Sequence, residues 1–424
     1  MKSKPPRVPI HLGGSKDRDV KADDGILTGV RILDFTRDMT GPYGTMVLGD
    51  FGADVIKVES APKGDPLRSA GTDFIHGQST MFLGWNRNKR SLCMDLRNPD
   101  AKLVISRLLG DVDVLIHNFR FGVPEQIGIG WDEVRLLNKR IIHIAVSSFG
   151  SKGPWRDRPG TDVLLQAMSG VMSVTGERDG TPVLIGVPVA SFTTAMVVVQ
   201  AALLGLMGRN ITGHGQHIEV PMLGVMISSL ATRLGPYFLT GENPAPTGHQ
   251  HSQLAPMQVF RTKDSYGFVS VLPDRWKAFC QVIGEDRLAD DPRFANNKAR
   301  MANRDELVEI IASRMLGRTT EEWDQLFADV AVAFGPVNRF SDVLESDQVK
   351  VNGILTSVTH PSLGEIRQTA PMIALSELPG AVRLPPPLLG EHNSEVLTEF
   401  GFTESEISSL AKSGLLYSQT APAN

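Results

Sequence analysis

Residues 30–59 read VRILDFTRDMTGPYGTMVLGDFGADVIKVE, and this stretch decides the fold. Its two ends, 30–35 and 54–59, are short apolar runs that indicate buried strands. Between them Pro42 suits the first turn of a helix, which we expect to end near Gly49. A strand, a helix and a strand in this order predict a parallel sheet that is covered by helices on both faces.

The alternation of strands and helices continues to about residue 205 and then changes. Further strands are expected at 91–96, 112–118 and 141–148, with helices at 99–109 and 123–137. We therefore predict an α/β fold with a Rossmann-like, parallel-sheet large domain over residues 28–205. Glycine and proline recur over residues 206–247, which predicts a linker.

The rest of the chain divides into three further segments. Residues 248–345 open with two expected strands, 258–261 and 266–271, and continue with helices, so they predict a small α+β domain. Residues 346–424 predict a return linker and a C-terminal helical segment of the large domain. Residues 1–27 are polar and predict a flexible N-terminal extension.

The composition argues against several classes of protein. The net charge of −4 gives no basic surplus, so we expect no nucleic-acid partner. Two cysteines cannot form a disulfide framework, which fits the reducing cytoplasm. The most apolar stretch, 195–207, is too short to span a bilayer and contains Gln200, so we expect a buried helix and no membrane partner.

The first strand–helix–strand unit has the outline of a dinucleotide-binding fold, but its loop does not. Residues 36–41 contain one glycine, whereas the turn that holds a pyrophosphate needs several. The sequence therefore disfavours NAD. Glu59 stands where such units hold a ribose hydroxyl, and it is equally well explained as a solvated strand end.

Ordered sequence blocks over about residues 28–418 resemble the family III CoA-transferases, the family of formyl-CoA transferase and L-carnitine CoA-transferase. The blocks are 29–36, 41–43, 48–59, 64–68 (GDPLR), 88–91 (NKRS), 95–96, 113–119 (DVLIHNF), 255–256, 291–294, 335–337 and 389–392 (LGEH). The resemblance implies a dimer of two interlocked rings. It also implies that coenzyme A or an acyl-CoA is a substrate, with no covalently bound cofactor.

The resemblance further implies a set of CoA contacts. The phosphates would be held by four cations, Arg68, Arg87, Lys89 and Arg90, although residues 87–90 also fit a solvated surface loop. Asn118 and Phe119 match a stretch that lines the CoA channel, and Met39 matches a position near the thioester. Many members have arginine where Gln126 stands, so one CoA contact is expected to be weaker here.

Residues 186–196, GVPVASFTTAM, match the segment that carries the family's nucleophile. In active members an aspartate stands at the place of Ser191 and forms anhydride and thioester intermediates. A serine would form a stable ester and needs a general base. We expect Ser191 to be the N-cap of a helix and assign no catalytic residue.

Related racemases use a histidine and an aspartate, and the matching positions hold Thr161 and Ser191. Proton exchange is therefore not expected. Asp162 remains as a support for the site or, less simply, as a nucleophile. His249, His251 and His392 lack the spacing of metal ligands, so no metal is predicted. His251 matches a loop that borders the site in relatives, which makes it a candidate substrate contact.

These observations predict a subunit of a heteromeric CoA-transferase that lacks its own nucleophile. By resemblance, CoA would move from succinyl-CoA to a carboxylic acid such as (R)-2-benzylsuccinate, in anaerobic toluene breakdown. The partner would be a paralogous subunit with the aspartate. Two alternatives stay open: a non-catalytic protein that binds CoA or acyl-CoA in a regulatory role, and a thioesterase or lyase that uses Ser191 or Asp162.

Overall fold

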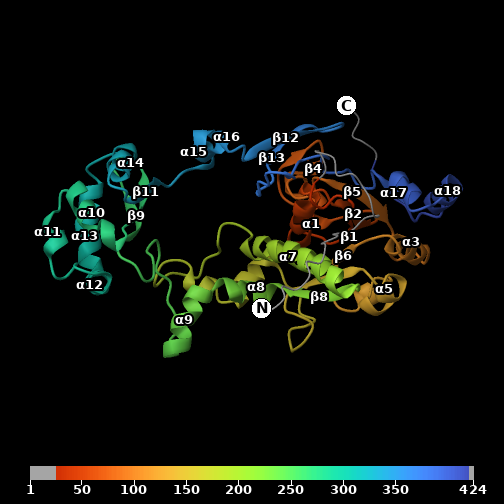
Figure 1. Cartoon of the computed structure of the whole chain (residues 1–424), viewed down its shortest axis with the longest axis horizontal. Coiled ribbons are helices and arrows are strands. Elements are labelled where there is room, and N and C mark those ends of the chain that lie inside the picture. The colour runs from red at the N-terminus through yellow and green to blue at the C-terminus, as the bar shows by residue number, and fades with distance from the viewer. Residues whose placement is uncertain (1–24, 420–424) are drawn as a thin grey trace, which may run out of the picture. The chain divides into compact units, whose positions relative to one another are not determined.

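The computed structural model describes residues 25–419, so nearly all of the predicted N-terminal extension lies outside the described residues. The chain forms two compact units (Figure 1). The first contains the residues up to 171, 185–235 and 352 onward, and the second contains 172–184 and 236–351. Each unit is described by itself.

The first unit is built on a six-stranded sheet in the order β5-β2-β1-β6-β7-β8. Every neighbouring pair is parallel. The strands are β1 (Arg31–Phe35), β2 (Asp54–Ser60), β5 (Lys89–Met94), β6 (Val114–His117), β7 (Ile142–Ser147) and β8 (Gln216–Pro221). The predicted parallel α/β fold is therefore confirmed.

Both faces of the sheet are buried because the strands are apolar at consecutive positions. Ile32 packs into one core with α1 (Thr40–Asp50), α7 (Val189–Thr212) and α8 (Met222–Ser229). Leu33, one residue later, points to the other face and its core. That second core contains side chains from α3 (Asp100–Leu109), α5 (Trp131–Leu137) and α17 (Asn393–Glu399). Figure 1 shows α1 and α7 side by side, as their contacts require.

The remaining elements of the first unit are short or peripheral. They are β3 (Phe74–Ile75), β4 (Gln78–Ser79), α2 (Thr80–Leu83), α4 (Val123–Gln126), α6 (Asp162–Met168), β12 (Leu355–His360), β13 (Gly364–Thr369) and α18 (Glu404–Lys412). α17 and α18 agree with the helical end expected for the C-terminal segment.

The predicted linker over residues 206–247 is wrong in its first half. α7 continues to Thr212, and β8 pairs with β7 as a strand of the main sheet. The glycines here make a tight turn between them: a Cβ on Gly215 would lie 1.9 Å from the carbonyl oxygen of Ile141. The signal that predicted a linker therefore marks a close backbone approach.

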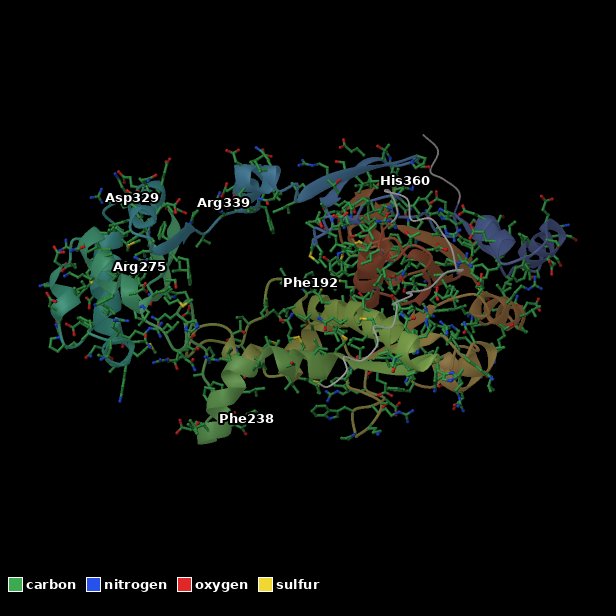
Figure 2. The ribbon with its side chains drawn as sticks, viewed as in Figure 1. Phe192, Phe238, Arg275, Asp329, Arg339 and His360 are labelled. Atoms are coloured by element: carbon green, nitrogen blue, oxygen red, sulfur yellow. The ribbon has the colours of Figure 1, made fainter. Side chains whose placement is uncertain are left out.

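α7 is long and apolar enough to cross a membrane by length and composition, and the bent pair α8 and α9 (Ala231–Thr240) passes the same test together. Half of the α7 window is buried inside the protein. Phe238 on α9 is 76% exposed (Figure 2).

The second unit has a three-stranded antiparallel sheet, β11-β10-β9, and its own core. Phe279 and Phe327 stack in that core with ring centroids 5.6 Å apart. The elements are β9 (Met257–Arg261), β10 (Tyr266–Ser270), β11 (Ala333–Pro336), α10 (Trp276–Val282), α11 (Arg287–Asp290), α12 (Asn297–Ala302), α13 (Arg304–Met315), α14 (Thr320–Asp329), α15 (Phe340–Glu345) and α16 (Asp347–Val351).

Candidate functional site

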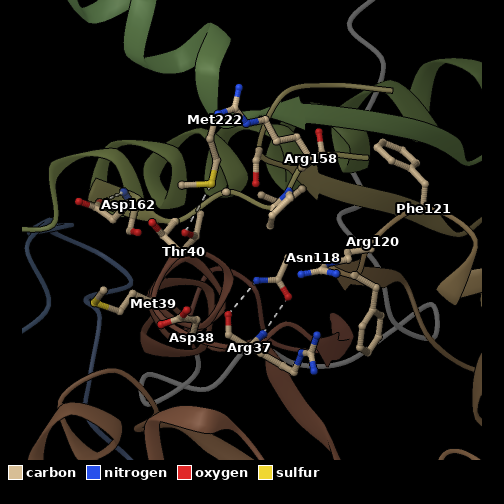
Figure 3. Close-up of a pocket in the computed structure, with 18 of the residues that line it drawn as sticks. Arg37, Asp38, Met39, Thr40, Asn118, Arg120, Phe121, Arg158, Asp162 and Met222 are labelled. Atoms are coloured by element: carbon tan, nitrogen blue, oxygen red, sulfur yellow. Dashed lines mark hydrogen bonds between the residues drawn. The ribbon is translucent and has the colours of Figure 1, made fainter. Parts of the chain in front are cut away.

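A cavity of about 580 Å³ lies at the carboxyl ends of β1, β6 and β7 in the first unit (Figure 3). The chain leaves β1 toward β2 on one side, while β6 lies on the other side, so the strand order reverses here. Ligands of parallel α/β sheets bind at such a point, because the loops on its two sides diverge. The loops after β1, β6 and β7 and the starts of α6 and α7 line the cavity.

Ser191 and Asp162 meet at the start of α7. The backbone N–H of Ser191 donates to Asp162 Oδ1 at 2.7 Å, and Gln166 Nε2 donates to Asp162 Oδ2 at 2.7 Å. A buried carboxylate at this place satisfies a free N–H of the first turn and suits the positive end of the helix dipole. Asp162 therefore supports the helix that carries position 191.

The expectation that Ser191 is an N-cap is wrong. α7 begins two residues earlier, at Val189, with Pro188 in the cap position. The side chain of Ser191 is almost fully buried yet lines the cavity. Within residues 25–419 its hydroxyl makes no hydrogen bond. Thr161, at the place of the racemase histidine, caps α6 by accepting from the backbone N–H of Leu164 at 3.3 Å.

The loop after β1 forms the opposite wall. Gly41 is needed there because a Cβ would lie 2.2 Å from the Cβ of Thr36. Asp38 has a φ of 68°, a backbone conformation that strains a residue with a side chain. Burial raises the pKa of the Asp38 carboxyl, and the nearby Asp65 and Asp162 add to this against the charge of Arg37.

The loops after β1 and β6 are tied together by a reciprocal pair of hydrogen bonds. The backbone N–H of Arg37 donates to Asn118 Oδ1 at 2.9 Å, and Asn118 Nδ2 donates to the carbonyl of Arg37 at 2.8 Å (Figure 3). The Arg37 guanidinium lies 4.9 Å from the ring centre of Phe119. Met39 also lines the cavity. The structure therefore brings Met39, Asn118 and Phe119 to the same cavity as position 191.

The four cations expected to bind CoA phosphates do not line this cavity. Each is buried against a carboxylate of the same unit. The pairs are Arg68 with Glu59 at 2.7 Å, Arg87 with Asp50 at 2.7 Å, Lys89 with Asp34 at 3.1 Å and Arg90 with Asp54 at 2.8 Å. Residues 87–90 are therefore neither a phosphate-binding group in this cavity nor a solvated loop.

Glu59 is likewise neither a ribose contact nor a solvated strand end. Burial by itself raises its pKa, but the charge and hydrogen bonds of Arg68, the charge of Lys57 and the hydrogen bond from Ser91 together outweigh burial, and the pKa is lowered to about 2. Arg68 donates to both carboxylate oxygens, from Nε at 2.8 Å and from Nη2 at 2.7 Å. The sequence could not reveal this pair, because nothing in the local sequence shows that a glutamate at a strand end and an arginine in a loop are buried together.

Sequence reasoning missed a different set of cations. Four arginines line the cavity from the loops after β1, β6 and β7: Arg37, Arg120, Arg156 and Arg158. Within residues 25–419, none of the four is within ion-pair distance of a carboxylate. Their position in the sequence could have identified them, since each arginine follows the carboxyl end of a predicted strand of the parallel sheet. The same cavity is lined by Asp38, Asp157 and Asp162, so the four guanidinium groups leave a small surplus of positive charge, which favours an anionic ligand.

The predicted substrate contact His251 belongs to the second unit. Its ring Nδ1 accepts from the backbone N–H of Gln253 at 3.2 Å, just before β9. Among the described residues there is no group of three or more histidine, cysteine, aspartate or glutamate side chains that could hold a metal ion. His392 Nδ1 accepts from the backbone N–H of Ser91 at 3.3 Å.

The family model for CoA-transferase family III matches residues 27–393. The chain belongs to this family. It is 35% identical to the succinyl-CoA:glutarate CoA-transferase of Mus musculus, covering 92% of this chain and 90% of that one. It is 33% identical to the succinyl-CoA–D-citramalate CoA-transferase of Chloroflexus aurantiacus, covering 91% and 96%.

Solved structures of the family agree with this assignment. A CAIB/BAIF family protein from Brucella suis superimposes with a TM-score of 0.80 at 31% identity, covering 89% of this chain and 100% of that one. The orthorhombic crystal form of Rv3272 from M. tuberculosis gives 0.78 at 29% identity, covering 88% and 99%. The protein is therefore a family III CoA-transferase, whose substrates are a CoA thioester and a carboxylate.

Proposed function

We propose that this chain is the nucleophile-lacking subunit of a CoA-transferase that moves CoA from succinyl-CoA to a carboxylic acid. The observation that carries the proposal is Ser191, which presents a hydroxyl to the cavity at the start of α7, where the family resemblance expects an aspartate. A paralogous subunit with that aspartate would complete the enzyme.

The chemistry of CoA transfer explains why serine cannot replace aspartate. A carboxylate attacks the thioester to give a mixed anhydride and CoA thiolate. The thiolate then attacks the enzyme-side carbonyl of the anhydride, which releases the donor acid as a carboxylate and leaves an enzyme thioester of similar energy. A serine would give an ester that the acceptor acid cannot convert back to a thioester with comparable ease. Asp162 does not activate Ser191 as a base would, because its Oδ1 accepts from the backbone N–H and not from the hydroxyl.

The proposed donor is succinyl-CoA because relatives carry it in their names, with glutarate or D-citramalate as the acceptor. The proposed acceptor includes (R)-2-benzylsuccinate, and the proposed location is the cytoplasm. The unpaired arginines around the cavity support an acidic donor and an acidic acceptor, because succinyl-CoA and all three acceptors carry carboxylates.

The test compares the purified chain with its Ser191→Asp variant and a Ser191→Asn control, which matches the aspartate in size without a charge. Succinyl-CoA and a carboxylic acid are supplied, and the new CoA thioester is measured by liquid chromatography. We expect background transfer for the wild-type chain and the asparagine variant, and a gain for the aspartate variant.

A second arm addresses the partner. Native mass spectrometry of the chain purified from its own host should show a second chain of similar size in equal copies, and the pair should transfer CoA. Robust transfer by the wild-type chain alone would sink the proposal. If that activity were lost in Ser191→Ala or Asp162→Ala, this chain would hold its own catalytic group.

A further inference from the structure

A second cavity, of about 190 Å³, adjoins the large one and plays no part in the proposal above. It lies over β6, β7 and β8 on the face opposite α7. Every second residue of a strand points to the same face of the sheet. The register places His143 beside His217 on the neighbouring strand, and His117 beside Ala145. We call it the histidine pocket; six rings line it, from His117, Phe119, Phe121, Trp131, His143 and His217.

The rings of the histidine pocket pack against one another. Trp131 stacks on His217 with ring centroids 5.9 Å apart, and His143 lies 5.0 Å from His217. His117 stands edge-on to His143 at 5.1 Å and stacks on Phe119 at 6.2 Å. Flat walls of this kind suit a flat ligand, since aromatic faces bind other aromatic rings by stacking.

The hydrogen bonds fix the state of the central imidazole. His143 Nε2 lies 2.9 Å from the carbonyl oxygen of Ile129, so it carries the proton and donates. Its Nδ1, 2.9 Å from His217 Nδ1, is then the acceptor of a proton on His217. Among the described residues, the ring of His117 has no hydrogen-bond partner.

Two of the three imidazoles in the histidine pocket, His143 and His117, are held in the neutral form by burial, and the third, His217, has its Nε2 3.6 Å from a carboxylate oxygen of Glu219. Burial lowers the pKa of His143 to about 4, and burial also lowers the pKa of His117 well below its usual value. The charged groups that line the pocket are Glu125 and Glu219, and Glu219 accepts from Ser151 Oγ at 2.6 Å. These carboxylates disfavour a phosphate or a carboxylate inside the pocket.

The pocket is a neighbour of the proposed active site and not an isolated void. It shares four wall residues with the large cavity: Phe119, Phe121, Val146 and Ser147. Figure 3 shows Phe121 at the edge of the large cavity, beyond Asn118 and Arg120. A ligand with its anionic part among the arginines can therefore extend an uncharged part toward the histidine rings.

We propose that the histidine pocket binds a planar, uncharged ring of a molecule whose anionic or thioester part occupies the large cavity. The inference rests on the proposed function to the extent that this molecule is a CoA thioester. Two sources can supply the ring: the adenine of CoA, or an aryl group on the acyl chain. His117 Nδ1 is a buried hydrogen-bonding atom without a partner among the described residues, and Trp131 lines the same pocket.

The experiment measures dissociation constants by calorimetry on the full chain and on Trp131→Leu, with Trp155→Leu as the matched control. Trp155 is exposed and lines neither cavity. The three ligands are succinyl-CoA, succinyl-phosphopantetheine, which lacks adenine, and benzylsuccinyl-CoA. His217→Ala is a second variant, because this ring lines the pocket and is partly exposed.

Both pocket variants should bind a ring-bearing thioester roughly tenfold more weakly or worse, and the control should not. A loss for both CoA thioesters but not for the phosphopantetheine form assigns the ring to adenine. A loss confined to benzylsuccinyl-CoA assigns it to the aryl group. Unchanged affinity for all three ligands in both folded variants would overturn the inference and leave the proposed function standing. No thioester binding by the wild-type chain would overturn both.

Discussion

Replacing Arg87 by methionine separates the structural role of this residue from a role in CoA binding. Arg87 is 2% exposed, and its guanidinium donates to both oxygens of Asp50, from Nε at 2.9 Å and from Nη2 at 2.7 Å. Its Nη1 donates to the carbonyl of Thr369 at 2.6 Å, which ties α1 to β13. Methionine keeps an unbranched apolar chain of similar length and removes the charge and all of these bonds.

The expected loss of stability follows from the buried Asp50 carboxylate, which would lose its charged partner. Asp50 is 1% exposed and would keep one side-chain donor, Asn88 Nδ2 at 2.8 Å. Breaking a buried ion pair by removing one partner destabilises a protein by roughly 3–5 kcal/mol. The remaining bond from Asn88 holds the expected loss near the lower end, at about 3 kcal/mol. The companion Arg87→Met, Asp50→Leu variant removes both charges and should recover much of this loss.

The assay is urea unfolding of the full chain, followed by circular dichroism, with the dissociation constant of CoA measured in parallel. We expect a lower urea midpoint for Arg87→Met and an affinity for CoA within about twofold of the wild type, because Arg87 does not line the cavity. An unchanged midpoint together with a tenfold weaker CoA affinity would refute the reasoning and restore Arg87 as a phosphate contact.

Three further predictions concern other groups. Asp162→Ala should lower the free energy of unfolding by about 1.5–3 kcal/mol, because the hydrogen bond to the Ser191 N–H is lost. Asp162→Asn keeps an acceptor oxygen and should recover most of the lost stability. Equal urea midpoints for the two variants would contradict this prediction. Against the effect of burial, Arg68, Lys57 and Ser91 together lower the pKa of Glu59 to about 2. The ionised Glu59 should therefore stabilise the fold by roughly 3 kcal/mol above pH 4.5 and lose this effect as pH falls toward 2; Glu59→Gln should flatten the stability profile there. His143, with its pKa lowered to about 4, should stabilise the fold above pH 6.5 and lose this effect as pH falls to 4; a nitrogen NMR titration should show a neutral ring with the proton on Nε2 at pH 6.

Strand positions could be predicted because burial on both faces leaves a local signature. The apolar runs 30–35 and 54–59 predict strands, and β1 and β2 differ from them by one residue at one end. The linker was misplaced because glycine signals both a flexible connection and a close approach of two backbones. The backbone of Gly215 lies against that of Ile141, and a contact between residues so far apart in the sequence cannot be read from the local sequence.

The sequence by itself determined the family, the parallel α/β sheet and the serine at position 191, because these follow from local apolar runs and from ordered motifs. The tertiary structure decided which charges face inward. Arg87 and Lys89 read as cations beside a loop, yet their partners Asp50 and Asp34 lie 37 and 55 residues earlier. The arginines that do line the cavity come from separate loops. A residue's type is local, but its electrostatic partner is set by the packing of distant segments, so only the folded chain shows which cations are free to meet a substrate.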